Sequence, residues 1–111
     1  MAVSDDFIQY VLDQLISWKD VRYKRMFGGA MLYCEGLAFG MIAGDILYMK
    51  VDDSNRNKYI KAGSAPLRPF KTHSMVLSFY NLPADILEDS DEFVQWAEES
   101  LMIQKRKNKI Q

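Results

Sequence analysis

The stretch "AMLYCEGLAFGMIAGDILYMKV", residues 30–51, decides the fold class of this 111-residue chain. It holds three short runs rich in apolar residues: Ala30–Cys34, Leu37–Ala43 and Ile46–Val51. Only two residues separate each run from the next, first Glu35-Gly36 and then Gly44-Asp45. Glycine in the first position of a two-residue loop suits a type II′ turn, so the second joint is the stronger hairpin signal. The stretch therefore predicts three consecutive antiparallel strands.

A glycine pair, Gly28-Gly29, precedes these runs and follows another strand-like run, Val21–Phe27. A phosphate-binding loop would need a helix after the glycines and usually a lysine, but here a strand-like run follows them. We therefore interpret the pair as a bend or bulge between strands. Two further glycines are also assigned to turns, Gly44 in the hairpin and Gly63 at a helix end.

Two-residue loops fix the register of neighbouring strands, so the side chains can be assigned to faces of the sheet. This register places Ala38 and Gly40 on one face, where their small size leaves room for helices. The opposite face is predicted to carry four apolar side chains together: Leu32, Phe39, Met41 and Tyr48. An exposed apolar patch commonly marks a partner site, so we expect a partner protein or a second copy of the chain to cover them. The alternative is that a loop covers them and the chain is monomeric.

Helical patterns flank the strands. An amphipathic helix is predicted over Ser4–Trp18, with Ser4 as N-cap and acidic residues in its first turn. After the strands we predict the following elements: a short helix Ser54–Ala62, a loop over 64–74, a fifth strand Met75–Tyr80, a short helix from Pro83 to Glu88, and a last helix from Asp89 or Ser90. This order predicts an α+β fold, an antiparallel β-sheet meander with helices packed mainly on one face. We expect one domain spanning residues 1–111.

Composition narrows the class of protein. The formal net charge is −1, so no global field attracts nucleic acid or an anionic membrane. A single cysteine excludes an internal disulfide framework and is typical of a reducing compartment. The acidic N-terminus does not resemble a signal peptide, and no apolar run approaches the ~18 residues of a membrane span. We expect a cytoplasmic protein.

Candidate catalytic chemistry is sparse. Cys34 with His73 as its base is the one arrangement for nucleophilic catalysis, but a lone cysteine more often packs as a small hydrophobe. One histidine and one cysteine lack the clustered spacing of a zinc site. Two carboxylate pairs, Asp52-Asp53 and Glu88-Asp89, lie at predicted helix ends, where capping explains them. We assign no catalytic residue, no metal site and no cofactor.

Basic residues are the candidate contacts for nucleic acid, and they fall into three groups. The first two consist of Arg22, Lys24 and Arg25, and of Lys105, Arg106, Lys107 and Lys109. The third consists of Arg56, Lys58, Lys61, Arg68 and Lys71. The groups could merge into one phosphate-binding surface. Alternatively, they are scattered solubilising charge and helix-end cations that complement the dipole, offset by the acidic stretch 85–99.

Several motifs occur together in order: "RMFGGAMLY", "GLAFGMIAGDILYMKVD", "AGSAPLRPF" and "FYNLPADILED…FVQWAEESL". This ordered set resembles the TfoX/Sxy N-terminal domain family from about Val21 to Leu101. The resemblance implies an α+β fold with an antiparallel sheet. It also implies a link to bacterial competence, where full-length relatives act as transcriptional co-activators beside a cyclic-AMP receptor protein. Those regulators carry a second, C-terminal domain, so the chain is expected to be a stand-alone N-terminal domain. The family offers no catalytic residues.

The leading functional hypothesis is therefore a non-enzymatic regulatory interaction module that acts through protein contacts. A transcription factor or a second copy of the chain is the expected partner, with no membrane involved. The first alternative is a direct nucleic-acid-binding protein that uses the basic groups. The second is a small enzyme or ligand-binding domain.

Overall fold

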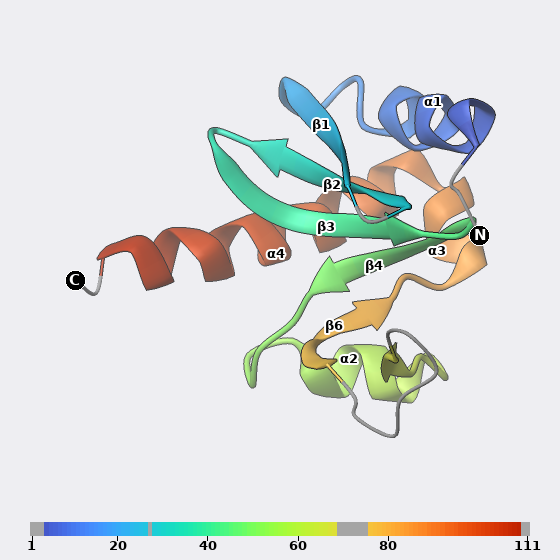
Figure 1. Ribbon diagram of the computed structural model, residues 1–111. Coiled ribbons are helices and arrows are strands. Elements are labelled where there is room, and N and C mark those ends of the chain that lie inside the picture. Colours follow the sequence, from blue (N-terminus) through green and yellow to red (C-terminus); the bar gives the residue numbers. More distant parts are fainter. Residues whose placement is uncertain (1–3, 27, 69–75, 110–111) are drawn as a thin grey trace.

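The computed structural model describes residues 4–26, 28–68 and 76–109 (Figure 1). Its elements in chain order are α1 (Asp5–Gln14), β1 (Val21–Met26), β2 (Gly29–Cys34), β3 (Leu37–Ala43), β4 (Ile46–Lys50), α2 (Arg56–Lys61), β5 (Pro66–Leu67), β6 (Val76–Asn81), α3 (Ala84–Glu88) and α4 (Ser90–Lys109). The predicted α+β fold is confirmed. No helix among the described residues is both long enough and apolar enough to cross a membrane.

The six strands form one antiparallel sheet in the order β1-β2-β3-β4-β6-β5. The meander predicted for the first four strands is confirmed. The predicted loop over 64–74 is wrong at Pro66–Leu67, which pairs with β6 at the sheet edge. Ala65 and Asn81 begin this pairing, since the Ala65 N–H donates to the Asn81 side-chain oxygen (2.8 Å). A proline fits here because an edge strand needs fewer N–H donors.

Both predicted two-residue hairpin turns are present. Gly44 has a positive φ of 62°, as a type II′ turn requires at its first position. In the other turn Glu35 (φ 54°) and Gly36 (φ 78°) are both left-handed, which is the type I′ pattern. The weaker sequence signal thus also marks a hairpin, with a non-glycine residue in the left-handed region.

A third hairpin turn joins β1 and β2, with Gly28 in the turn and Gly29 as the first residue of β2. Met26 pairs with Gly29, and Gly28 has a φ of 76°. A β-carbon at Gly29 would lie 2.2 Å from the backbone oxygen of Ile42, so no larger residue fits without movement. The predicted bend between strands is confirmed. Phe27, which we placed in the preceding strand, lies outside the described residues.

The predicted register of β2 against β3 is wrong because the pairing contains a β-bulge. Leu32 pairs with Gly40 and Tyr33 pairs with Ala38, which leaves Phe39 as an extra residue. An extra residue shifts the alternation of side chains on one side of the bulge. Leu32 therefore shares its face with Gly40 rather than with Met41, which pairs with Tyr48 on the opposite face.

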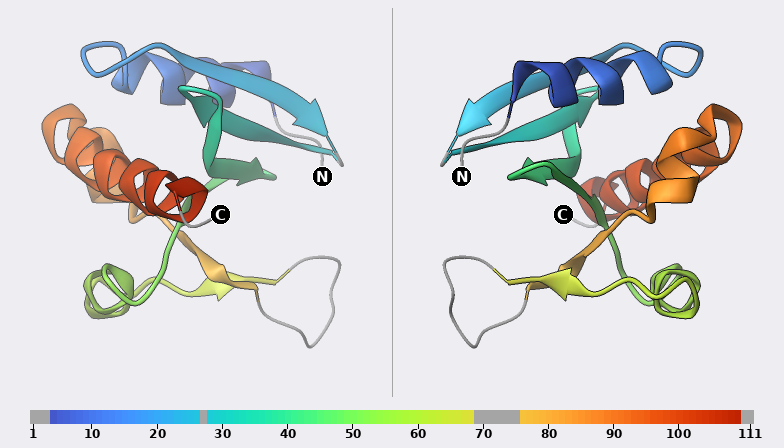
Figure 2. Two further views of the ribbon diagram at one scale, coloured as in Figure 1. Left: turned by 90° about the vertical axis from the view of Figure 1, so that its left-hand side faces the viewer. Right: turned by 90° about the vertical axis from the view of Figure 1, so that its right-hand side faces the viewer.

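The helices lie on one side of the strands in both views of Figure 2, as predicted. Apolar residues of α1 and α4 are fully buried with those of the sheet: Ile8, Val11, Phe93, Ala97, Leu101, Leu32, Ile42 and Met49. Phe39 joins this core, and its ring meets Trp18 edge-on at a centroid distance of 5.4 Å. Two side chains of α4 also donate hydrogen bonds to backbone carbonyls of the sheet. The Ser100 hydroxyl donates to Lys50 (2.8 Å), and the Gln104 amide donates to Ala38 (2.6 Å).

The helix ends follow their capping residues. The Ser4 hydroxyl accepts a hydrogen bond from the Phe7 N–H (3.1 Å), so Ser4 is the N-cap of α1 as predicted. That helix ends at Gln14, earlier than the predicted Trp18, and hydrogen-bonded turns follow it. Asp89 caps α4 through the Glu92 N–H (3.2 Å).

Candidate functional site

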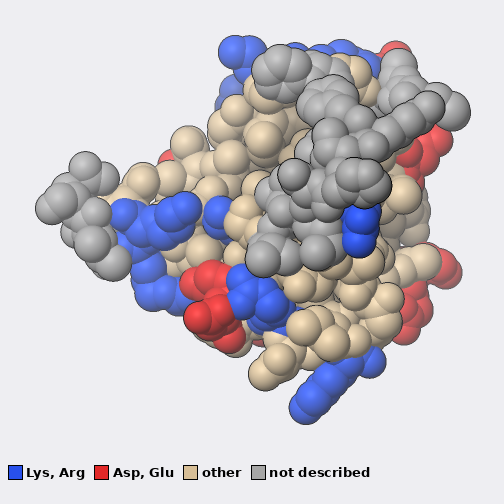
Figure 3. All heavy atoms as spheres, turned by 60° about the horizontal axis from the view of Figure 1, so that its bottom comes forward, with Lys and Arg blue, Asp and Glu red and all other residues tan. Residues whose placement is uncertain are grey.

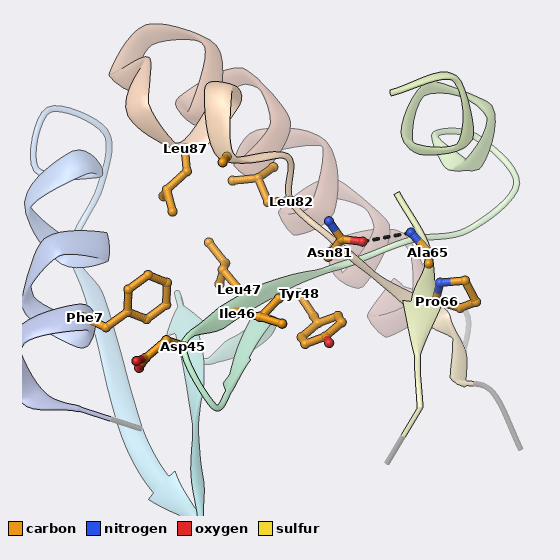
Figure 4. A pocket seen from close by; sticks show the side chains of 11 residues that line it. Phe7, Asp45, Ile46, Leu47, Tyr48, Ala65, Pro66, Asn81, Leu82 and Leu87 are labelled. Carbon is orange, nitrogen blue, oxygen red and sulfur yellow. Dashed lines mark hydrogen bonds between the residues drawn. The ribbon is translucent and has the colours of Figure 1, made fainter. Parts of the chain in front are cut away.

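A pocket of about 520 Å³ opens where β4, β5, β6, α1 and α3 approach one another (Figure 4). Its lining is formed by Phe7, Asp45, Ile46, Leu47, Tyr48, Ala65, Pro66, Asn81, Leu82, Ala84 and Leu87. The volume falls within the range of ligand and side-chain binding pockets, about 300–1,000 Å³. Residues far apart in the sequence thus build a single cavity.

The pocket floor is apolar and fixed in place. Leu47 and Leu82 are buried and joined through the backbone, since the Leu82 N–H donates to the Leu47 carbonyl (2.8 Å). Leu87 of α3 is also buried beside them. Ile46 is different because 49% of its surface is exposed, although it is a large apolar residue. Ile46 therefore extends the apolar lining of the pocket to its exposed edge.

Few polar groups line the pocket, and two of them hold its walls together. The Asp45 carboxylate accepts from the backbone N–H (3.5 Å) and the hydroxyl (3.4 Å) of Ser4, which links the start of α1 to the β3–β4 turn. The Asn81 side-chain oxygen accepts from the N–H of the neighbouring Ala65, which joins the β5 and β6 parts of the wall, as the dashed line in Figure 4 shows. The pocket thus offers an apolar interior with a carboxylate at its rim.

The four predicted interface residues do not form one patch. Leu32 and Phe39 have no exposed surface, so they belong to the core and the prediction that they lie on an open face is wrong. The bulge at Phe39 is the physical reason. Met41 and Tyr48 remain paired on the face away from the helices and are half-buried. Tyr48 also lines the pocket, so it is the predicted interface residue that the structure brings to the candidate site.

The predicted nucleic-acid contacts are largely engaged with carboxylates. On β1, Arg22 pairs with Asp20 (3.1 Å) and Arg25 pairs with Asp5. Lys24 is exposed. Side chains alternate between the two faces along a strand, so Arg25 lies on the opposite face of the sheet from Arg22 and Lys24. Arg25 pairs with Ala30, which lies on the same face of β2 as the buried Leu32. The β1 cations therefore do not point to one surface.

The cations near the end of α4 also have acidic neighbours. Lys105 lies 3.2 Å from Glu35, and Arg106 lies 3.4 Å from Asp52. The side chain of Lys109 lies outside the described part of the chain. On the face drawn in Figure 3, a basic group lies directly beside an acidic group. These residues form a surface of mixed charge.

The third basic group follows the same pattern. Arg56 pairs with Asp53, and Lys58 pairs with Glu99 (2.9 Å) while its ammonium lies 4.4 Å from the centre of the Trp96 ring. Lys61 and Arg68 are exposed, and Lys71 lies outside the described residues. The second and third groups meet at residues 52–54, where Arg106 pairs with Asp52 and Arg56 pairs with Asp53, so acidic side chains lie among these cations.

A comparison with known families adds to this geometry. The family model of the TfoX N-terminal domain matches residues 13–103. The chain belongs to the TfoX N-terminal domain family. None of the curated proteins compared with the chain matches it. The matched segment includes every residue that lines the pocket except Phe7, so the pocket is mostly built from the family domain itself.

Cys34 does not have the environment of a reactive thiol in this TfoX N-terminal domain. Only 1% of its surface is exposed, and burial raises the pKa of its thiol, with the charge of Glu35 acting in the same direction. A thiolate is the reactive form of cysteine, so a raised pKa disfavours nucleophilic chemistry. His73, its suggested partner, lies outside the described residues. Among the described residues, no three His, Cys, Asp or Glu side chains are grouped to hold a metal ion.

Sequence reasoning missed one unusual group, the buried lysine Lys50. Only 8% of it is exposed, and its ammonium lies 5.3 Å from the centre of the Phe79 ring. Burial lowers the pKa of Lys50, and the nearby charge of Lys107 lowers it further. The sequence shows only a lysine at the end of an apolar strand. This is a weak signal for a buried lysine, because residues at strand ends are usually exposed.

Proposed function

We propose that this TfoX N-terminal domain is a non-enzymatic regulatory module that acts through protein contacts in the transcriptional control of competence. The observation that supports a contact role is the apolar pocket with the half-exposed Ile46 at its mouth. Apolar cavities with few polar groups bind side chains or small molecules through burial of apolar surface. The family supports the link to competence.

Protein is favoured over nucleic acid as the partner. Six of the twelve cations in the three basic groups are paired with carboxylates: Arg22, Arg25, Arg56, Lys58, Lys105 and Arg106. Releasing a cation from its carboxylate opposes the gain from a phosphate contact, and the net charge of −1 adds no general attraction. A transcription factor or a second copy of the chain is the proposed partner, and no cofactor is invoked.

A pull-down from the native host tests this function. The tagged full chain is cross-linked in cells, purified with and without nuclease, and its partners are identified by mass spectrometry. We expect a protein that remains after nuclease treatment. Loss of all partners on nuclease treatment would favour the alternative of a direct nucleic-acid binder, and absence of any enriched protein would contradict the proposal.

Two exposed isoleucines provide a matched pair of variants for the same pull-down. Ile46 (49% exposed) lies at the pocket mouth, whereas Ile60 (52% exposed) lies on α2 and does not line the pocket. Ile46→Glu should reduce recovery of the partner, and Ile60→Glu should leave it unchanged. Equal recovery with both variants would move the contact away from the pocket.

A further inference from the structure

Acidic residues occur next to the pocket lining on α1 and α3 and in the β3–β4 turn. Asp45 lines the pocket directly. Three other acidic residues each adjoin a lining residue in the chain, where α-carbons are about 3.8 Å apart. They are Asp6 beside Phe7, Asp85 beside Ala84, and Glu88 beside Leu87. All four acidic side chains are exposed. Asp45 thus gives the pocket one carboxylate, and the three other acidic residues lie next in sequence to lining residues of α1 and α3.

These four carboxylates form no ion pair with a cation among the described residues. The neighbouring Asp5, by contrast, is paired with Arg25. Two cations lie within two residues of a lining position, namely Lys50 and Arg68. Lys50 follows the lining residue Tyr48 of β4, and Arg68 follows the lining residue Pro66 of β5. Lys50 is buried. On the α1 and α3 side, acidic residues therefore outnumber basic ones within two positions of the lining.

We propose that the pocket binds a bulky apolar side chain of a partner protein, and that the acidic rim binds Lys or Arg residues that flank this side chain. This proposal rests on the proposed function, because it names the chemistry of the partner segment. The volume of about 520 Å³ accommodates an aromatic or branched aliphatic side chain. The unpaired carboxylates supply charge complementarity, which sets the choice of partner and the rate of association.

The same charges exclude other occupants. A phosphate group approaching this rim would meet exposed carboxylates and be repelled, so nucleic acid and anionic lipid do not fit here. An acidic peptide is disfavoured for the same reason. A basic segment of a partner protein with an apolar anchor satisfies both the interior and the rim.

Two synthetic peptides test the proposal on the full chain. One is Gly-Lys-Lys-Leu-Phe-Lys-Lys-Gly, and the other replaces each lysine by glutamate. Amide chemical shifts of the ¹⁵N-labelled protein are followed during titration with each peptide. We expect the lysine peptide to shift the amides of Ile46, Leu82 and Leu87, and the glutamate peptide to leave them in place. Binding should weaken as salt rises from about 0.05 to about 0.5 M, because salt screens the exposed carboxylates.

Three variants separate the apolar and the charged contributions. Ala84 is exposed and lines the pocket, so Ala84→Phe should fill the cavity and weaken lysine-peptide binding by about tenfold or more, a change of about 1.4 kcal/mol. Asp45→Asn should weaken it by about threefold. Asp20→Asn is the matched control: it also removes one exposed carboxylate, but Asp20 does not line this pocket. This control should bind as the wild type does, and thermal melts confirm that each variant is folded.

The proposal is overturned if the lysine peptide leaves the pocket amides unshifted, if both peptides bind equally, or if folded Ala84→Phe binds as the wild type does. These failures are distinct from failure of the proposed function. A partner that survives nuclease treatment and is recovered equally by Ala84→Phe would leave a protein-contact role in place while removing this pocket as its site.

Discussion

Gly29 lies so close to Ile42 that a β-carbon on it would be 2.2 Å from the Ile42 carbonyl oxygen. The contact joins the start of β2 to the end of β3, and it involves backbone atoms that cannot rotate away. Gly28 differs, since its β-carbon would meet open space while its φ is 76°. The two neighbouring glycines are therefore required for different reasons.

Substitution at these two glycines should separate the reasons. Gly28→Ala should lower the free energy of unfolding by about 1–2 kcal/mol, the cost of a left-handed conformation for alanine. Gly29→Ala should cost more, about 3 kcal/mol or above, because strand backbones must move apart. Urea denaturation of both variants measures the two values. A Gly29→Ala variant as stable as the wild type would show that β2 and β3 separate easily.

Phe39 provides a test of the bulge and the buried face. Phe39 has no exposed surface, whereas Met41 in the same strand is half-buried on the other face. Phe39→Ala should cost about 3–5 kcal/mol, and Met41→Ala clearly less, because truncating a fully buried side chain also leaves a cavity. Urea denaturation again provides the comparison. Equal costs would mean that the two faces are equally buried and that the assigned register is incorrect.

How far the sequence predicts this structure depends on the range of the interactions involved. The hairpins, the helix caps and the order of elements rest on local signals such as Gly44 and Ser4, and these predictions were correct. The extra residue Phe39 has no local signal, because a bulge depends on how two strands pair. The pairing of Pro66 with β6 depends on Asn81, which is distant in sequence.

The candidate site was harder to predict than the fold. The pocket lining comes from five separate elements and the segments beside them, and only Tyr48 had been singled out as an interface residue. The position of the pocket follows from the way α1 and α3 meet the start of β4. The periodicity of one chain segment does not predict such a meeting of distant segments. The neutralisation of the basic groups also depends on tertiary contacts, such as that of Lys105 with Glu35.

Glu35 should give the stability of the domain a dependence on acid. Hydrogen bonds from Lys19 and Lys105 hold the pKa of Glu35 below its usual value. Because the folded-state pKa is lowered, the ionised Glu35 stabilises the protein at every pH above the usual glutamate pKa of about 4.3. This stabilisation is lost as the pH falls through the pKa of Glu35 in the folded state. Glu35→Gln should therefore be less stable than the wild type at pH 7.

The difference between Glu35→Gln and the wild type should disappear as the pH falls below about 4.3. Thermal melts across the pH range measure it. Asp20→Asn is the control, since Asp20 forms one exposed ion pair with Arg22 and should contribute little at any pH. A difference that persists in acid would mean that Glu35 acts through its shape or its backbone, rather than through its charge.

Binding to nucleic acid should be weak. Because half of the candidate cations are paired with carboxylates, we expect duplex DNA to bind with a Kd weaker than about 1 μM at about 0.15 M salt. Fluorescence anisotropy with a labelled duplex measures this. The variant with Lys105, Arg106, Lys107 and Lys109 changed to Gln should behave like the wild type. Tighter binding that this variant abolishes would instead favour the nucleic-acid alternative.

Lys50 should reduce the stability of the domain at neutral pH. Burial and the charge of Lys107 lower its pKa, and Asp52 offsets this only in part. Lys50 therefore binds a proton more readily in the unfolded state than in the folded state. Its charge lowers the free energy of unfolding at pH 7, and this effect disappears as the pH approaches the usual lysine pKa of about 10.4. Lys50→Met keeps an unbranched side chain but removes the ammonium that lies over the ring of Phe79.

We therefore expect Lys50→Met to raise the free energy of unfolding at pH 7 by at most about 1 kcal/mol, and the gain to shrink as the pH approaches about 10.4. Urea denaturation at the two pH values tests this, with Lys24→Met as a control at an exposed position. The control should be close to neutral at both pH values, since a single exposed charge contributes little. A Lys50→Met variant less stable than the wild type at pH 7 would contradict the expectation, because it would show that the buried ammonium is held by a favourable contact stronger than the repulsion from Lys107.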